Sequence, residues 1–225
     1  MRVYLDNAAT TPIAPEVTKA ITEVLANDFG NPSSTHFYGR HVKAHIENSR
    51  RNIAKHINCS PSEIVFTSGG TEADNMALTS SICNLGIKRI ITSSIEHHAV
   101  GHTAEFLHEQ GRVKLDIVNI DEKGHVDLLH LEQLLSSNQK TLVSLMHANN
   151  EIGNLLPIEK VSKLCAKYNA LFHCDTVQTI AHLPIDVKKT PFDFLVCSAH
   201  KFHGPKGVGF LYVNKKINIT PLIHG

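Results

Sequence analysis

The stretch IVFTSGGTEADNMAL, residues 64–78, changes character twice along its length. Its first four residues form a short apolar run that is typical of a buried strand. The glycine turn Ser68-Gly69-Gly70-Thr71 follows, and the remaining residues suit a helix. Thr71 and Asp74 have the spacing of a capping box, with aspartate in place of the usual glutamate. The stretch therefore predicts a strand, a glycine turn and a helix, in that order.

The same alternation continues on both sides of this stretch. Short apolar strands separated by longer helices indicate an α/β domain with a largely parallel sheet. We expect residues 1–14 to be an extended segment and residues 15–225 to form one large domain. Further strands are predicted at 89–92, 113–118, 142–146, 171–174, 192–196 and 208–213. Helices are predicted at 15–27, 36–57, 72–78, 99–110, 126–135 and 157–167.

The composition narrows the class of protein. A net charge of +1, without a run of Lys or Arg, argues against a nucleic-acid surface. No apolar run approaches the ~20 residues needed to span a bilayer, and the first residues lack an apolar signal core. The 5 cysteines are an odd number without C-x-x-C spacing, which favours free thiols in a reducing compartment. We therefore expect a cytoplasmic protein with no membrane or nucleic-acid partner.

The sequence holds 16 histidines, and two pairs of them are spaced four residues apart. On a helix, His41 and His45 would share one face, as would His98 and His102, and such a pair can hold a metal ion. No third ligand stands at a suggestive spacing, so solvent-facing side chains are the preferred interpretation of His41 and His45. We predict no metal site.

Small, polar and ionisable residues follow the predicted strands where each strand ends. In open α/β sheets, ligands bind at the carboxyl ends of the strands. Each group alone is weak evidence, but five together are hard to explain by the needs of folding. The groups are residues 68–71, 94–98, 147–151, 175–178 and 198–201.

Three of these groups suggest a ligand chemistry. The turn before the helix at 72–78 offers backbone N–H groups, the helix dipole and the Thr71 hydroxyl to a phosphate, although an ordinary helix cap would look the same. It matches neither the dinucleotide fingerprint nor the Walker loop. Asp175 ends an apolar strand without an evident Lys or Arg partner, so it suits a ligand cation such as a protonated pyridine nitrogen. The alternative role of Asp175 is a helix N-cap.

Lys201 follows a predicted buried strand and stands close to Ser198 and His200. A partly desolvated lysine loses its proton more easily and becomes a nucleophile toward an aldehyde. Taken alone, the stretch at 197–207 favours a solvated lysine in a Gly-Pro turn, because lysines are common in such turns. Together these three features suit pyridoxal 5′-phosphate (PLP). The turn would bind its phosphate, the carboxylate its protonated ring nitrogen and the lysine its aldehyde.

The same residues carry a family resemblance. The chain resembles the cysteine desulfurases of the class-V aminotransferase family, in the NifS/IscS-like branch. The resemblance implies the PLP-dependent transferase fold type I, with a mostly parallel mixed sheet flanked by helices as its large domain. The matching motifs run through the whole chain, at residues 4–11, 30–34, 66–75, 96–97, 146–153, 173–178 and 198–201.

The resemblance also implies a role for each site residue. Lys201 would bind the cofactor aldehyde and later act as general base, and its choice over Lys206 follows from the family motif. Asp175 would keep the ring nitrogen protonated, and His97 would stack on the ring and move protons. Asn150 and Gln178 would bind the phenolic oxygen of the cofactor. The residues implied for the phosphate are Gly70, Thr71, Ser198 and His200.

The implied activity removes sulfur from L-cysteine, giving L-alanine and a persulfide for iron–sulfur cluster assembly or other sulfur transfer. The resemblance further implies a homodimer and a sulfur-acceptor or scaffold protein as partners. Members of the family are longer, and their nucleophilic cysteine, substrate-carboxylate arginine and second-subunit threonine come later in the chain. We expect residues 15–225 to be the PLP-binding large domain, truncated before the C-terminal small domain. The alternatives are another class-V enzyme, such as a selenocysteine lyase or an aminotransferase, and a PLP-binding fragment without turnover.

Overall fold

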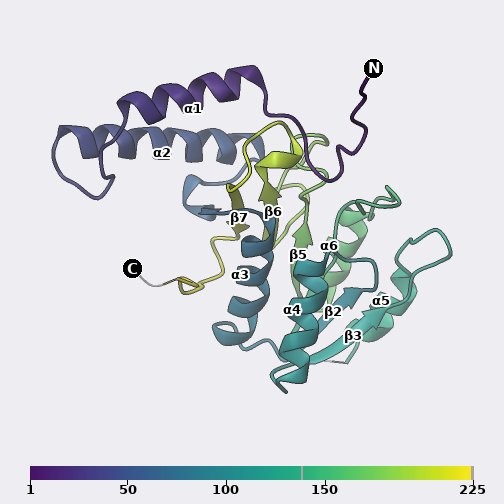
Figure 1. The fold of residues 1–225 in the computed structure, drawn as a ribbon. Coiled ribbons are helices and arrows are strands. Elements are labelled where there is room, and N and C mark those ends of the chain that lie inside the picture. Colours follow the sequence, from purple (N-terminus) through teal and green to yellow (C-terminus); the bar gives the residue numbers. More distant parts are fainter. Residues whose placement is uncertain (138, 224–225) are drawn as a thin grey trace.

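A seven-stranded sheet organises the chain (Figure 1), in the strand order β1-β7-β6-β5-β4-β2-β3. The computed structural model describes residues 1–137 and 139–223. Strand β7 is antiparallel to both of its neighbours, β1 and β6, while the other strand pairs are parallel. The predicted mixed, largely parallel sheet is therefore confirmed. The strands are β1 Ile64–Thr67, β2 Arg89–Ser93, β3 Lys114–Val118, β4 Thr141–Ser144, β5 Leu171–Asp175, β6 Phe194–Ser198 and β7 Gly209–Val213.

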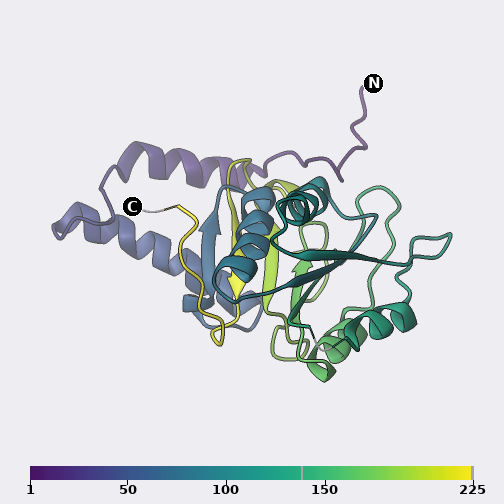
Figure 2. The same cartoon turned by 90° about the horizontal axis from the view of Figure 1, so that it is seen from below.

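Helices cover both faces of the sheet (Figure 2). Side chains of a strand alternate between its two faces, so Phe194 and Val196 pack with α3 and α4, whereas Leu195 and Cys197 pack with α5 and α6. The interior strand β6 is buried throughout, as expected for a strand covered on both sides. The helices are α1 Pro15–Asn27, α2 Phe37–His56, α3 Gly70–Cys83, α4 His98–Glu109, α5 Leu128–Leu135 and α6 Ile158–Lys167.

The start of α3 differs from the sequence prediction. The helix begins at Gly70, with Gly69 as its N-cap at a φ of 155°, a conformation that favours glycine. Glu72, not Asp74, returns to the turn, and its carboxylate accepts a hydrogen bond of 2.7 Å from the backbone N–H of Ser68. Asp74 lies deeper in the helix and is buried. The predicted capping box of Thr71 and Asp74 is therefore wrong, because the helix starts earlier than the sequence spacing suggested.

Helices α1 and α2 lie side by side and extend from the sheet (Figure 1), and we call residues 15–56 the helical arm. Helix α1 has no buried residue, and α2 buries only Gly39 and Ala54. The arm therefore gains little from the hydrophobic core, except near the end of α2, where Ala54 packs against the sheet.

Residues 1–14 form neither helix nor strand, and they run along the loop that follows β6. The backbone N–H of Thr11 donates to the carbonyl of His200 at 2.9 Å, and that of Ala14 donates to the carbonyl of His203 at 3.0 Å. These bonds bring the beginning of the chain to the edge of the sheet at which β6 ends.

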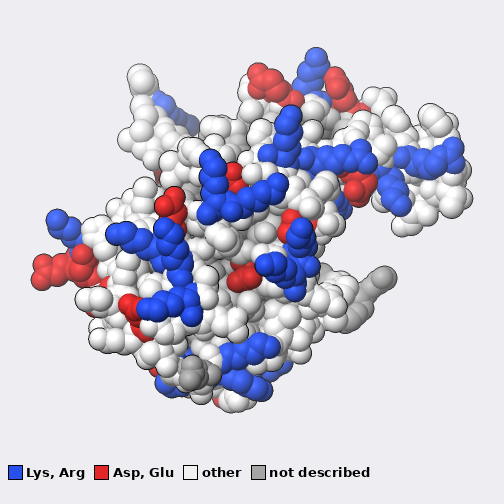
Figure 3. All heavy atoms as spheres, turned by 180° about the vertical axis from the view of Figure 1, so that it is seen from behind, with Lys and Arg blue, Asp and Glu red and all other residues white. Residues whose placement is uncertain are grey.

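Charged side chains of both signs share the surface. On the face shown in Figure 3, Lys and Arg lie over the arm and the sheet domain with Asp and Glu between them, in keeping with a net charge of +1. Within residues 1–137 and 139–223, no helix combines the length and the apolar character needed to cross a membrane.

Candidate active site

A cavity of about 410 Å³ opens where the strands β4, β5 and β6 end and where α3 begins. Every predicted site residue lines it, although these residues come from turns far apart in the sequence. The N-terminal segment closes one side with Asp6, Ala8 and Ala9. The predicted residues in its wall are Gly70, Thr71, His97, Asn150, Asp175, Gln178, Ser198, His200 and Lys201.

Asp175 is a buried carboxylate at the end of β5. Burial raises the pKa of its carboxyl to about 7, and the nearby charge of Asp74 adds to this increase. The backbone N–H of Val177 donates to Asp175 at 2.9 Å, which partly opposes the rise. Among the described residues, no Lys or Arg forms an ion pair with Asp175. The cavity therefore contains a buried carboxyl group whose ionised form a cationic group of a ligand would stabilise.

Asp74 and His173 form a second buried polar pair beneath the cavity. His173 Nε2 lies 3.3 Å from Asp74 Oδ1, but the two are not aligned for a hydrogen bond, and both atoms lack a partner. Burial lowers the pKa of His173 to about 4 and raises the pKa of Asp74 well above its usual range. His173 is therefore neutral at pH 7, and burial favours the neutral form of Asp74 as well.

Glu96 is a third acidic group near the cavity, and the sequence analysis gave it no role. Its Oε1 accepts a hydrogen bond of 2.6 Å from the Ser93 hydroxyl, while Oε2 is shielded and has no partner. Burial raises the pKa of Glu96 to about 8. Its position directly before His97 was the only hint in the sequence that Glu96 lies near the site. Nothing in the local sequence pattern indicates that its carboxylate is buried.

Lys201 ends a short 3₁₀ turn, Ala199–Lys201, that directly follows β6. Its ammonium donates hydrogen bonds to the carbonyls of Ala8 and Ala9, the latter at 2.9 Å. Burial lowers the pKa of Lys201, and the negative charges of Asp175 and Asp6 partly oppose this effect. Lys206 is exposed and does not line the cavity. The structure thus places Lys201, and not Lys206, beside Asp175 in one cavity.

The beginning of α3 lies beside the end of β6 in the wall of the cavity. Gly70 and Thr71 belong to the first turn of a helix, so their backbone N–H groups have no acceptor within that helix. Close approach requires glycine here, because a Cβ on Gly70 would lie 2.9 Å from a methyl group of Val177. Ser198 is buried beside this turn, and His200 Nδ1 lies 3.1 Å from the Thr10 hydroxyl. Burial, followed by the charges of Lys201 and Lys206, lowers the pKa of His200, which favours the neutral ring.

The three remaining predicted residues border the opening. His97 is the N-cap of α4, and its Nδ1 accepts a hydrogen bond of 3.1 Å from the backbone N–H of Ala99, which leaves Nε2 for the cavity. The side-chain amide of Asn150 donates to Glu151 at 2.7 Å, and that of Gln178 donates to the carbonyl of Ala8 at 2.9 Å. A ligand oxygen near either amide would therefore replace an existing partner.

Comparison with known proteins gives a consistent result. The aminotransferase class-V family matches residues 3–225. The cysteine desulfurase IscS of Dictyoglomus turgidum is 48% identical over 225 residues, which cover 99% of this chain and 57% of that relative. The IscS of Methanosarcina thermophila is 44% identical, over 99% of this chain and 55% of its own length. The chain thus spans somewhat more than half the length of these curated relatives.

Solved structures share the fold. A NifS-like protein aligns with a TM-score of 0.95 at 43% identity, over all of this chain and 62% of that one. A structure described as SspA in complex with cysteine aligns with a TM-score of 0.94 at 34% identity, over all of this chain and 65% of its own. The fold predicted from the sequence is therefore confirmed at the level of the whole chain.

Proposed function

Because the chain belongs to the aminotransferase class-V family, we propose that it is the cofactor-binding part of a PLP-dependent cysteine desulfurase. The proposed reaction takes sulfur from L-cysteine and yields L-alanine and an enzyme-bound persulfide. One observation carries the proposal: turns from distant parts of the chain place a lysine, a buried carboxylate and a helix N-terminus around one cavity. Relatives named cysteine desulfurase, and a similar structure solved with cysteine, support the choice of substrate.

The residues present fit PLP. Asp175 lacks a cationic partner among the described residues, and a protonated ring nitrogen would provide one. The N–H groups at Gly70 and Thr71, with Ser198 and His200, would hold the phosphate. The amine of Lys201 would bind the aldehyde. When bound, the cofactor takes up the electron pair left on the substrate α-carbon.

Two side chains of the cavity are suited to holding or moving protons. Asp175 would hold the proton on the ring nitrogen, because a carboxylate next to a cation stays ionised. Lys201 binds its proton less tightly than an exposed lysine does, so its amine Nζ would accept a proton from the substrate. We propose that His97 covers the ring, with Nε2 free to exchange a proton because Nδ1 is already occupied.

None of the five cysteines is proposed as the sulfur acceptor. Cys165, Cys174 and Cys197 are buried, and burial raises the pKa of each thiol. Cys59 is half-buried with a pKa of about 11, and Cys83 is exposed at the end of α3. No cysteine lines the cavity within the described ranges. We assign the acceptor thiol and the substrate-carboxylate arginine to the part of the longer relatives that this chain does not match.

The wider setting follows from the same family. We propose a cytoplasmic homodimer that passes sulfur to an acceptor or scaffold protein for iron–sulfur cluster assembly. We also propose that residues 15–225 are the large domain and that residues 1–14 complete its cavity, since Gln178 and Lys201 bond to Ala8. Two other functions compete: another class-V activity, such as a selenocysteine lyase or an aminotransferase, and PLP binding without turnover.

The test compares Lys201→Ala with Lys206→Ala, which removes a nearby lysine outside the cavity. We expect PLP to give the long-wavelength absorbance band of a lysine Schiff base in the unchanged chain and in Lys206→Ala. Lys201→Ala should lose the band completely. A band that persists in Lys201→Ala would contradict the proposed site.

Product analysis with L-cysteine separates the activities. Alanine and sulfide in equal amounts indicate a desulfurase. Products formed from selenocysteine but not from L-cysteine, or transfer of the amino group to a keto acid, indicate another class-V enzyme. A chain that forms the band but yields no product supports cofactor binding without turnover.

A further inference from the structure

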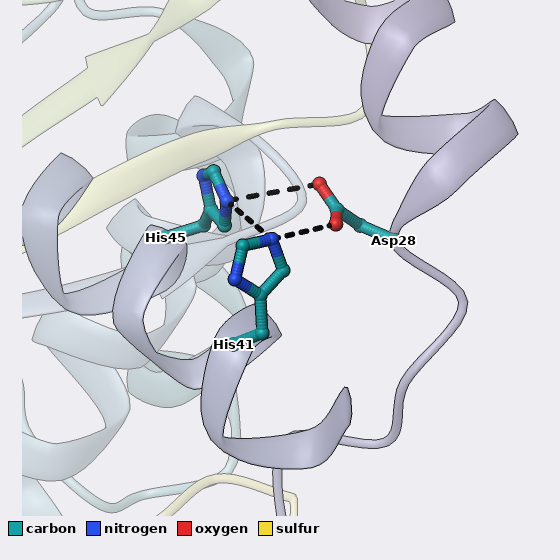
Figure 4. Close-up of side chains that lie close together, drawn as sticks. All are labelled: Asp28, His41 and His45. Carbon is teal, nitrogen blue, oxygen red and sulfur yellow. Dashed lines mark hydrogen bonds and ion pairs between the residues drawn. The ribbon is translucent and has the colours of Figure 1, made fainter. Parts of the chain in front are cut away.

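The helical arm carries a cluster of metal-binding side chains that the active site does not use (Figure 4). His41 and His45 lie one turn apart on α2, and Asp28 follows the last residue of α1. His41 Nε2 lies 3.1 Å from one Asp28 oxygen, and His45 Nε2 lies 3.8 Å from the other. The two imidazole Nε2 atoms are 3.2 Å apart. The spacing in the sequence suggested no third side chain for this histidine pair, but the turn after α1 brings in Asp28.

These distances fit a single metal ion. Zinc binds imidazole nitrogen and carboxylate oxygen at about 2.0–2.2 Å in a tetrahedral arrangement, which places neighbouring ligand atoms about 3.3 Å apart. Two of the three separations, 3.1 and 3.2 Å, are close to that value. The third separation, 3.8 Å, is measured to the other oxygen of Asp28, and all the ligand atoms lie within 4.8 Å of one another.

The carboxylate of Asp28 has few alternatives to such an ion. Its side chain is only 11% exposed, and within the described chain the two imidazoles are its only neighbours at ion-pair distance. A carboxylate so poorly hydrated favours a cation at short range. The side chains of His41 and His45 are 50% and 52% exposed, so an ion can reach the cluster from solvent.

The backbone holds the three ligands in place without an ion. The N–H of Asp28 donates to the carbonyl of Val24 at 2.8 Å, which fixes it at the end of α1. A Cβ on Gly30 would lie 2.3 Å from the carbonyl oxygen of Tyr38, and one on Gly39 would lie 2.4 Å from that of Ser34. The turn between the helices therefore fits tightly against the first turn of α2. A site whose ligands are positioned in advance loses less entropy when it binds.

Two other clusters show what is special about this one. His98 and His102 have the same ring-centre separation as His41 and His45, 4.7 Å, but no carboxylate completes a group of three. His125 and Asp121 lie 3.0 Å apart but lack a second imidazole. Within residues 1–137 and 139–223, the arm holds the one group of three such ligands.

We propose that Asp28, His41 and His45 bind a divalent transition-metal ion of the zinc class, with the fourth position open to water. Two imidazoles and one carboxylate suit Zn²⁺, Co²⁺, Ni²⁺ or Cu²⁺ and do not suit Mg²⁺ or Ca²⁺, which prefer oxygen ligands. The ion joins α1, which has no buried residue, to α2. The site is separate from the proposed cofactor cavity, and neither depends on the other.

The test measures Zn²⁺ binding by calorimetry on the whole chain after metal removal with EDTA. The exposed Cys83 is replaced by Ser in every protein compared, so that its thiolate does not compete. The test variant is His41→Gln with His45→Gln, and the matched control is His98→Gln with His102→Gln. We expect one Zn²⁺ per chain in the parent and the control, and at least a tenfold weaker affinity in the test variant.

A second variant and a second measurement keep the outcome clear. Asp28→Asn should weaken Zn²⁺ at least tenfold as well, and Zn²⁺ should raise the melting temperature of the parent but not of Asp28→Asn. Far-ultraviolet circular dichroism checks that each variant is folded. The proposal is overturned if folded test variants bind Zn²⁺ as tightly as the parent does, if the control pair weakens equally, or if Mg²⁺ binds as well as Zn²⁺.

Discussion

The cavity at the sheet edge and the ligand cluster on the arm are two different ways of building a site. The cavity collects residues from five turns and from the N-terminal segment, and its carboxylates Asp175 and Asp74 are buried. The arm cluster comes from one helix pair, and its histidines are about half exposed. In the cavity, burial changes the chemistry of the groups, because it shifts the pKa values of Asp175 and Lys201. On the arm, geometry alone creates the site.

The difference determines how each region should respond to mutation. A buried charge without a partner is costly, so removing or neutralising it has a large effect on ligand binding or stability. A half-exposed ligand can be replaced at little cost to the fold, so its loss should affect metal binding alone. The two regions can therefore be separated by variants that change one and leave the other intact.

The largest expected effect is that of Asp175→Asn on cofactor binding. Removing one partner of a buried ion pair costs roughly 3–5 kcal/mol, which corresponds to a PLP affinity weaker by about 10²-fold to 5 × 10³-fold. Asp6→Asn is the matched control, because Asp6 lines the same cavity but is exposed, so that water screens its charge. Equilibrium titration with PLP measures both. Equal losses in the two variants would show that burial of Asp175 is not the cause, and Zn²⁺ binding should be unchanged in both.

The next effect concerns the pH dependence of stability in the cofactor-free chain. The pKa of Glu96 is raised to about 8 in the folded state, so between about pH 4.5 and 8 the folded chain binds more protons than the unfolded chain. Stability should therefore fall as the pH rises through this range. Glu96→Gln removes this contribution and should stabilise the chain by up to ~5 kcal/mol above pH 8, with little effect near pH 4. Urea unfolding at pH 4.5, 6.5 and 8.5 tests this, with exposed Glu105→Gln as control. A gain of the same size at every pH would contradict the burial argument.

Much of the cavity could be predicted from the sequence, because the rule for parallel sheets is geometric. Once the strands ending at Thr67, Asp175 and Ser198 are recognised, the residues that follow them have to gather at one edge. The roles of Lys201 and Asp175 then follow from the chemistry of their side chains and from the family resemblance. Each predicted strand lies within about two residues of the observed one, since apolar runs bounded by glycine and polar turns leave few alternatives.

The features that the sequence did not reveal depend on packing or on turn geometry. Asp74 fits a capping box by spacing alone, but the start of α3 at Gly70 turns its side chain into the protein. The burial of Glu96 depends on residues that are distant in the sequence, such as Met146. Asp28 becomes a possible third ligand only because the turn that follows it folds back on α2. No local pattern in the sequence carries that information.

The smallest expected effect tests whether the backbone of the arm positions its ligands. Gly39→Ala removes no ligand, but the new Cβ would lie 2.4 Å from the carbonyl oxygen of Ser34, so the turn after α1 has to move. We expect a destabilisation of about 1–3 kcal/mol and a Zn²⁺ affinity about tenfold weaker, because the turn carries Asp28. Gly101→Ala is the matched control, since Gly101 also lies in a helix but its Cβ would meet no atom within 4 Å. That substitution should stabilise the chain by about 0.5–1 kcal/mol and leave Zn²⁺ binding unchanged. If Gly39→Ala bound Zn²⁺ as tightly as the parent, the arm would adapt to the ion, and the backbone of the turn would not be what positions Asp28.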